Sequence, residues 1–210
     1  MKLVDVSYCQ QNVDFNELKL KGIMSIIIRT GYKNKTDTKF LQHIENAIKN
    51  GFNIGVYTFN MSDSINEAKE EAQETIERIT PYKEYINLPI FSDLEHSKYF
   101  TGNWNEEKRS KIINTFCDEI KKQGYLSGIY TNGVMLETHK HLLKNYPVWL
   151  AHWTGKPWES KYLKNDNIFI HQYGTTNIYG EKVDINESKK LLALIEKCEQ
   201  FKNYHYFNTL

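Results

Sequence analysis

The sequence is poor in cysteine, and its three cysteines do not form a zinc or disulfide framework. The number of cysteines is odd, none are in a CxxC spacing, and all three are far apart in the sequence: Cys9, Cys117 and Cys198. Free thiols of this kind are typical of a protein made in a reducing compartment. His139 and His141 would diverge on a helix, which makes them a poor metal pair. We therefore expect no metal site and no cofactor.

Long apolar runs and an excess of one charge are also missing. No segment approaches the roughly 18 apolar residues of a membrane span, so we expect no membrane insertion. The first residues, MKLVDVSYCQQ, lack the apolar core and cleavage site of a standard secretory signal. The net charge is +1 and no basic run stands out, which predicts no nucleic-acid partner. With 210 residues, 40% of them hydrophobic, the chain is long enough for one globular domain with a core.

Short apolar runs recur along the chain and alternate with polar, helix-like stretches. Eight runs are strand-like, which is the number that a closed β/α barrel needs. Several are continuous rather than alternating, as in parallel sheets buried on both faces. The eight runs are residues 3–7, 25–30, 53–59, 88–93, 126–132, 148–153, 168–173 and 182–186.

Helical spacing, caps and terminators predict four helices. They are residues 38–50, 62–79, 105–123 and 186–199. Residues 153–168 and 174–181 carry little helical pattern, so we expect bare loops there. We therefore expect an α/β fold, an abbreviated and irregular (β/α)8-type barrel with fewer helices than a full TIM barrel. Residues 1–199 would form the barrel, and residues 200–210 a C-terminal tail that is docked on it, a linker stub or a self-association surface.

The segment LPIFSDLE, residues 88–95, ends an apolar run with two carboxylates. In a strand, Asp93 and Glu95 would point to the same face, with Cα atoms roughly 6.5–7 Å apart. Glycosidic bond hydrolysis needs such a pair, with one carboxyl group to protonate the leaving oxygen and another to stabilise or attack the anomeric carbon. The alternative is a strand that ends in two solvated acids.

Further polar and aromatic residues lie in the other strands or at their carboxyl ends, where parallel barrels place functional residues. Asp5 and Asp184 lie in the first and eighth strands, which become neighbours when a barrel closes. Four crowded carboxylates would raise at least one pKa, and aromatic side chains beside them suit sugar rings. Alternatively, Asp5 and Asp184 are structural or pair with Arg29. The candidate substrate-binding residues are Arg29, Tyr57, Phe59, Tyr130, Asn132, Trp149, Trp153, Gln172 and Tyr173.

These motifs together resemble glycoside hydrolase family 25, from about residue 3 to about residue 195. The segments that carry the resemblance are DVSYCQQNVDF, IIIRTGYKNKTDTKFLQHIENAIKNGFNIGVYTF, LPIFSDLE, GYLSGIYTN, VWLAHW and KVDIN. The resemblance implies hydrolysis of the β-1,4 bond between N-acetylmuramic acid and N-acetylglucosamine, with net retention. It implies that Glu95 is the acid/base and that Asp93 assists the substrate N-acetyl group. Asp5 and Asp184 match the two further acids of the family's site.

The resemblance also implies bacterial peptidoglycan as the partner. We expect synthesis in the bacterial cytoplasm and action on the cell wall after release, as for an endolysin or autolysin. Many family members have His where Thr58 stands and Tyr where Trp153 stands. Two other functions remain open, a non-catalytic sugar-binding barrel and a hydrolase of another amino-sugar polymer such as chitin.

Overall fold

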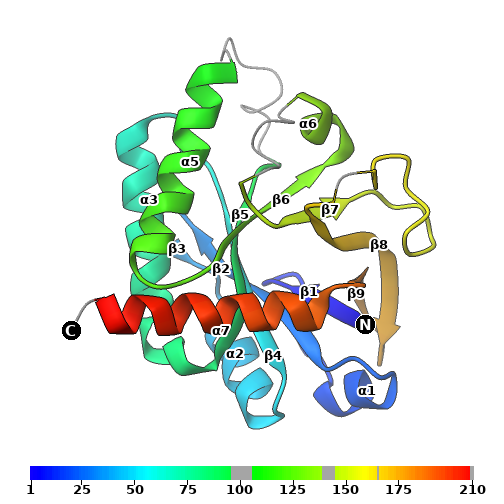
Figure 1. Cartoon of the computed structure of the whole chain (residues 1–210). Coiled ribbons are helices and arrows are strands. Elements are labelled where there is room, and N and C mark those ends of the chain that lie inside the picture. The colour runs from blue at the N-terminus through cyan, green and yellow to red at the C-terminus, as the bar shows by residue number, and fades with distance from the viewer. Residues whose placement is uncertain (96–105, 139–144, 165, 209–210) are drawn as a thin grey trace.

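Eight strands close into a barrel in the computed structural model, which describes residues 1–95, 106–138, 145–164 and 166–208 (Figure 1). Pairing of β1 with β2 closes the ring. A further short strand, β3 (Lys35–Thr36), forms a hairpin with β2 outside the ring. The ring consists of β1 (Lys2–Val6), β2 (Ser25–Tyr32), β4 (Asn53–Phe59), β5 (Ile86–Asp93), β6 (Ser127–Asn132), β7 (Val148–Ala151), β8 (Ile168–Ile178) and β9 (Glu181–Glu187).

The last strand of the ring runs against its neighbours. The ladders from β1 through β2 and β4 to β8 are parallel, whereas β9 is antiparallel to both β8 and β1. The expectation of a bare loop over residues 174–181 was therefore wrong. Strand β8 continues to Ile178, and a turn at Tyr179 and Gly180, with φ of 45° and 90°, starts β9. Two positive φ values are typical of a tight β-hairpin, which reverses the chain without a crossover helix.

The four predicted helices are present, with shifted ends. They are α2 (Phe40–Lys49), α3 (Ile65–Ile79), α5 (Glu106–Lys122) and α7 (Leu191–Asn208). The sequence patterns did not predict α1 (Phe15–Leu20), α6 (Gly133–Thr138) or the 3-10 helix η1 (Thr80–Tyr85). The described part of residues 152–167 contains no helix, so one late connection is short of helix as expected. No helix in the described ranges is long and apolar enough to cross a membrane.

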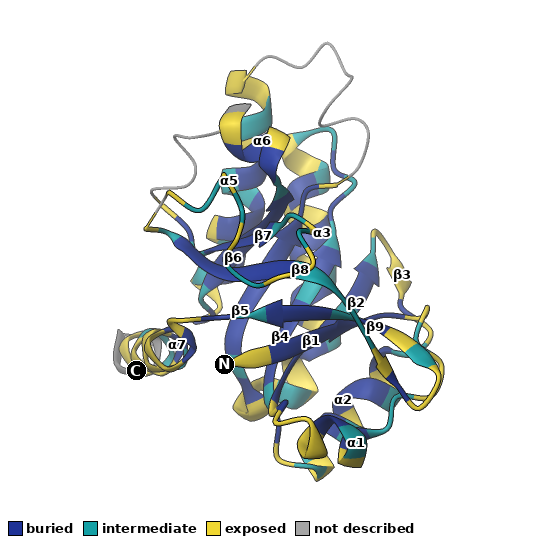
Figure 2. Cartoon of the chain, turned by 90° about the vertical axis from the view of Figure 1, so that its right-hand side faces the viewer, coloured by how far each residue is buried: buried dark blue, intermediate teal, exposed yellow. Residues whose placement is uncertain are grey.

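Helix α7 differs most from its predicted bounds. It begins at Leu191 rather than at Asn186, because Asn186 belongs to β9, and it continues to Asn208. Leu191 and Leu194 pack in one apolar cluster with Leu3 and other residues near the starts of strands. Figures 1 and 2 accordingly show α7 beside the N-terminus and the start of β1. Helix α7 therefore covers the end of the barrel at which the parallel strands begin.

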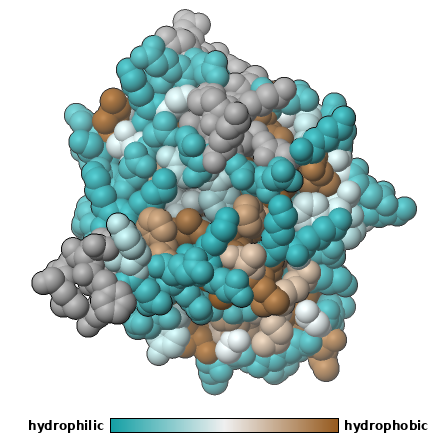
Figure 3. Space-filling model, viewed as in Figure 1, coloured by the Kyte–Doolittle hydropathy of each residue, from teal (hydrophilic) through white to brown (hydrophobic). Residues whose placement is uncertain are grey.

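Residues 200–208, which we expected to form a separate tail, are the last part of helix α7. Lys202 on this helix donates from Nζ to the backbone oxygen of Lys83. The face seen in Figure 3 is mostly hydrophilic, with some apolar areas among the hydrophilic ones. Leu192 on α7 is 63% exposed. Self-association through residues 200–210 stays a prediction.

The core has two layers on either side of the strands. An outer layer packs α2, α3 and α5 against the barrel, and an inner layer fills the barrel itself. Trp149 lies in the inner layer, with its ring against those of Tyr57, Phe91 and Tyr130. The burial colours of Figure 2 show the strands dark blue along most of their length. This filled interior is a rigid floor for whatever lies at the carboxyl ends of the parallel strands.

Candidate active site

Asp5 and Asp184 lie directly opposite each other in the antiparallel pair of β1 and β9. Residues opposed in this way project to the same face, with Cβ atoms about 4.5–5.5 Å apart. Asp5 is only 6% exposed, and its Oδ2 accepts hydrogen bonds from Asn186 Nδ2 at 2.7 Å and Gln172 Nε2 at 3.0 Å. Burial, followed by the charge of Asp184, raises the pKa of Asp5 to about 8. The closure of the barrel thus brings together two acids from opposite ends of the chain.

Asp93 and Glu95 lie at the end of β5. Asp93 is 4% exposed, whereas Glu95 is exposed. The backbone N–H of Glu95 donates to Asp93 Oδ1 at 3.2 Å. In the parallel register, Phe59 and Tyr130 stand beside Asp93 on the neighbouring strands. One acid is therefore fixed inside the barrel rim and the next is open to solvent.

The four carboxyl groups act on one another. Burial and the charge of Glu95 raise the pKa of Asp93 well above its usual value, with Asp5 as a smaller contributor. The pKa of Asp184 is also raised by burial and by Glu95, although Lys182 opposes the shift. Glu95 contributes to the raised pKa of Asp5 as well. The structure therefore gathers all four predicted acids into one electrostatic group.

Two side-chain amides connect the acids to the aromatic residues. Gln172 Oε1 accepts from Tyr130 Oη at 3.0 Å and from Trp153 Nε1 at 2.9 Å, while its Nε2 binds Asp5. Asn186 Oδ1 accepts from Trp149 Nε1 at 2.7 Å while its Nδ2 binds Asp5. In each amide, the oxygen thus accepts a hydrogen bond from an aromatic side chain and the nitrogen donates one to Asp5.

Asn186 was missed in the sequence. It follows Asp184 by two residues in β9, so strand alternation places the two side chains on one face. That spacing is the same signal that identified Asp93 and Glu95. The same i, i+2 spacing in the segment KVDIN, residues 182–186, predicts that Asn186 lies beside Asp184.

The predicted aromatic residues occupy different depths. Trp153 is 56% exposed, and Tyr57 is half-buried with its pKa raised by burial and by Asp5. Trp149, at 1% exposed, lies beneath this layer, and its assignment as a substrate-binding residue stays a prediction. Its indole supports Tyr57 from below and fixes Asn186.

Two other predicted contacts fall away from the acids. Tyr173 packs on the outer layer, with its ring 6.1 Å from that of His171, because it follows the inward Gln172 by one residue. Asn132 uses its Oδ1 to accept the backbone N–H groups of Val134 and Met135 at the start of α6. It is a helix cap. His96, His139 and His141 lie outside the described residues.

Arg29 does not pair with Asp5 or Asp184. Its Nε donates to Asp37 Oδ2 at 2.6 Å, and its guanidinium carbon lies 4.5 Å from the centre of the Tyr8 ring. The alternative that Arg29 neutralises the two paired acids was therefore wrong. Its charge still lowers the pKa of Asp93 and Tyr57 against the larger effect of burial. Asp37, eight residues from Arg29 in the sequence, was not predicted.

An α/β barrel with crowded carboxyl groups and exposed aromatic side chains at one rim is typical of glycoside hydrolases. Residues 4–181 match the sequence profile of Glycosyl hydrolases family 25. The match spans most of the chain, so the chain belongs to this family.

Solved structures agree with the fold. The bacterial lysozyme from Streptomyces coelicolor is 22% identical, with a TM-score of 0.76 over 94% of this chain and 98% of that one. The spore cortex lytic enzyme SleM from Clostridium perfringens is 19% identical, with a TM-score of 0.78 over 92% and 68%.

The modular autolysin LytC from Streptococcus pneumoniae was solved in complex with a synthetic peptidoglycan ligand. It is 25% identical, with a TM-score of 0.73 over 88% of this chain, and the chain spans only 46% of it. A valine–tRNA ligase from Haloarcula marismortui is 29% identical over 117 residues, which is 53% of this chain and 12% of the ligase. The chain thus spans about half of one matched protein and about an eighth of the other.

Proposed function

We propose that the protein hydrolyses bacterial peptidoglycan at the β-1,4 bond between N-acetylmuramic acid and N-acetylglucosamine. The observation that carries the proposal is the group of Asp93 and Glu95 with Asp5 and Asp184 in a family 25 barrel. The peptidoglycan ligand bound by LytC supports the substrate class. Exposed Trp153 adds a flat apolar surface of the kind that sugar rings pack against.

Glu95 is the acid/base of the proposed reaction. Its exposed carboxyl group donates a proton to the glycosidic oxygen as the C1–O bond breaks. The carbonyl oxygen of the substrate N-acetyl group forms the new bond to C1. Water then attacks C1, the bond to the acetyl oxygen breaks, and Glu95 accepts the proton from that water. Two displacements at C1 give net retention.

Asp93 supports the N-acetyl group in this scheme. Its raised pKa means that the free site tends to keep a proton on Asp93. An acetamido N–H that donates to Asp93 stabilises the carboxylate form, because hydrogen bonding to a charged form favours it. Substrate binding thereby opposes the effect of burial on the pKa of Asp93, and the backbone N–H of Glu95 holds the same carboxyl group in place. Asp93 and Glu95 project from the same strand end, which favours attack by the N-acetyl group over attack by a protein carboxylate.

Replacement of Glu95 by Gln tests the assignment. Glu95→Gln keeps the size of the side chain and removes the transferable proton, so we expect normal folding and a loss of at least about 100-fold in clearing of purified cell walls. Glu45→Gln is the matched control, because Glu45 is also exposed but lies on α2. Mass spectrometry should find N-acetylmuramic acid at the reducing ends released by the wild type.

Three outcomes would count against the proposal. Full activity of Glu95→Gln would remove Glu95 from its role. Binding of walls without clearing by the wild type would identify a sugar-binding barrel. N-acetylglucosamine at every new reducing end would indicate another bond or another amino-sugar polymer.

A further inference from the structure

A cavity of about 570 Å³ lies beside the acids, next to the hairpin of β2 and β3. Its walls combine aromatic and apolar side chains with two cations. Residues lining it include Tyr8, Arg29, Tyr32, Lys35, Phe59 and Met61. None of the four acids lines it.

The cavity adjoins the acids through Arg29 and Phe59. Phe59 stands beside Asp93 in the register of β4 and β5. Arg29 stands beside Tyr57 in the register of β2 and β4, and its charge acts on Asp93. A substrate bound at the acids therefore has this cavity within reach of a substituent on the same sugar.

Asp37 holds the guanidinium group of Arg29 in place and uses only its Nε donor. Asp37 is buried and binds the Nε edge of Arg29, the backbone N–H of Tyr8 and the backbone N–H of Lys39. Neither Nη group of Arg29 hydrogen-bonds any residue in the described ranges. The Lys35 ammonium adds a second cation, 5.8 Å from the centre of the Tyr32 ring. The cavity is lined by two cations, Arg29 and Lys35, and by one carboxylate, Asp37, which already accepts three hydrogen bonds. The cavity therefore favours an anionic ligand.

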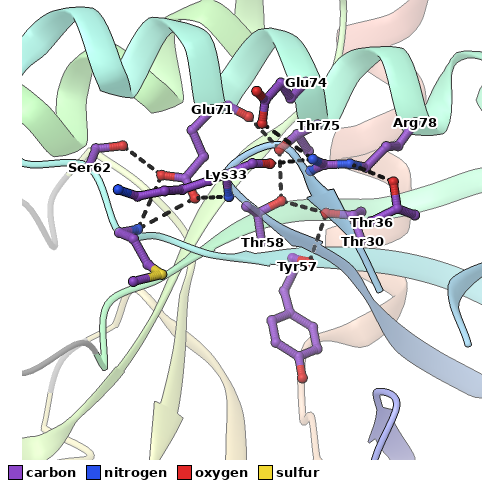
Figure 4. Close-up of polar contacts among 11 residues, drawn as sticks. Thr30, Lys33, Thr36, Tyr57, Thr58, Ser62, Glu71, Glu74, Thr75 and Arg78 are labelled. Carbon is purple, nitrogen blue, oxygen red and sulfur yellow. Dashed lines mark hydrogen bonds and ion pairs between the residues drawn. The ribbon is translucent and has the colours of Figure 1, made fainter. Parts of the chain in front are cut away.

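Helix α3 holds two segments that carry cavity-lining residues, and Figure 4 shows polar contacts that it makes with them. The buried Glu71 accepts the backbone N–H groups of Lys33 at 3.1 Å and Met61 at 3.1 Å, and the Ser62 hydroxyl at 2.6 Å. Two turns further on, Arg78 donates to the backbone oxygen of Lys33 and to the Thr36 hydroxyl of β3. Lys33 is held at a φ of 43°, which a non-glycine residue rarely adopts. The hairpin and the segment at Met61 are thus anchored before any ligand arrives, which lowers the entropy cost of binding.

We propose that this cavity is a subsite for the acidic peptide stem carried by the N-acetylmuramic acid residues of peptidoglycan. The inference rests on the proposed function. The stem combines free carboxylates with small apolar side chains, which matches two cations among aromatic and apolar walls. An uncharged sugar ring would give neither the Nη groups of Arg29 nor the Lys35 ammonium an anionic partner. The cavity would therefore make the enzyme prefer glycan strands that still carry their stems.

The test compares two glycan substrates. Purified strands with intact stems are digested beside the same strands after an amidase has removed the stems. We expect the wild type to have the higher kcat/KM on stem-bearing strands. Lys35→Gln should lower that value about fivefold, because one charge-assisted contact is lost, and should change kcat/KM less on the stripped strands, which keep only the lactyl carboxylate that the amidase frees. Lys49→Gln, an exposed change on α2, is the control.

A binding measurement separates this inference from the proposed function. Free stem peptide should bind the wild type, and amidation of its carboxylates or the change Lys35→Gln should weaken binding about fivefold. Equal losses by Lys35→Gln on both strand types, or no loss on either, would overturn the subsite. If the wild type cleaves neither strand but binds the peptide, the proposed function fails and the subsite stands.

Discussion

Replacement of Asp5 by Asn should stabilise the folded protein in alkaline solution. The carboxyl group of Asp5 is buried beside Asp184, and its pKa is raised from 3.8 to about 8. The folded protein therefore binds this proton more tightly than the unfolded chain does. The associated stability is complete below about pH 4 and is lost progressively as the pH rises to about 8. Asn is uncharged at every pH, so Asp5→Asn avoids this loss.

The structure also sets the size of the effect. The pKa change corresponds to an upper limit of about 6 kcal/mol above pH 8. Relaxation of the surroundings and entry of water reduce the cost of a buried charge, so we expect about 1–3 kcal/mol. The Asn oxygen can accept the same bonds from Gln172 and Asn186 that Asp5 Oδ2 accepts. Its NH2 group then replaces a carboxylate oxygen near Asp184, which removes a repulsion.

Thermal unfolding across a pH series measures this difference. The midpoint of Asp5→Asn should match that of the wild type near pH 4 and exceed it by several degrees at pH 8–9, since about 1 kcal/mol corresponds to 2–4 °C at this chain length. Asp166→Asn, an exposed change before β8, should show no such divergence. If Asp5→Asn is the less stable protein at pH 9, the carboxylate of Asp5 is stabilising and the electrostatic reasoning is wrong.

Two further predictions concern packing around the barrel. Gly128→Ala would place a Cβ atom 2.6 Å from the buried ring of Phe91, so we expect a loss of about 1–3 kcal/mol in chemical denaturation, and an unchanged midpoint would refute this contact. Thr58→Val removes the middle hydroxyl of a buried chain, 2.6 Å from Thr30 Oγ1 and 2.8 Å from Thr75 Oγ1. Each neighbour loses a partner, which should cost about 1–2 kcal/mol by the same measurement, and a neutral result would show that water replaces the hydroxyl.

The apolar runs of the sequence were enough to place all eight strands of the ring. They also predicted that Asp5 and Asp184 meet, because ring closure alone makes the first and last strands neighbours. The direction of β9 was missed, since residues 175–177 carry polar side chains that conceal a continuing strand. The antiparallel arrangement depends on the turn at Tyr179 and Gly180. The number and spacing of the apolar runs do not reveal this local feature.

The depth of each side chain was harder to predict than its strand. Trp149 lies in β7 and Trp153 follows the end of that strand by two residues, yet Trp149 is 1% exposed and Trp153 is 56% exposed. Alternation gives the face of a strand and says nothing about distance from the rim. The pairing of Arg29 with Asp37 depends on the hairpin of β2 and β3, which no periodicity indicated.

The position of β9 between β1 and β8 has a consequence for biosynthesis. The carboxyl pair of Asp5 and Asp184 joins residues 179 positions apart, and the ring can close only when the final hairpin inserts. Contacts of such long range form late in folding. A nascent chain on the ribosome therefore has no complete acid group until nearly all of its barrel has emerged, and a protein truncated before residue 184 would be an open sheet.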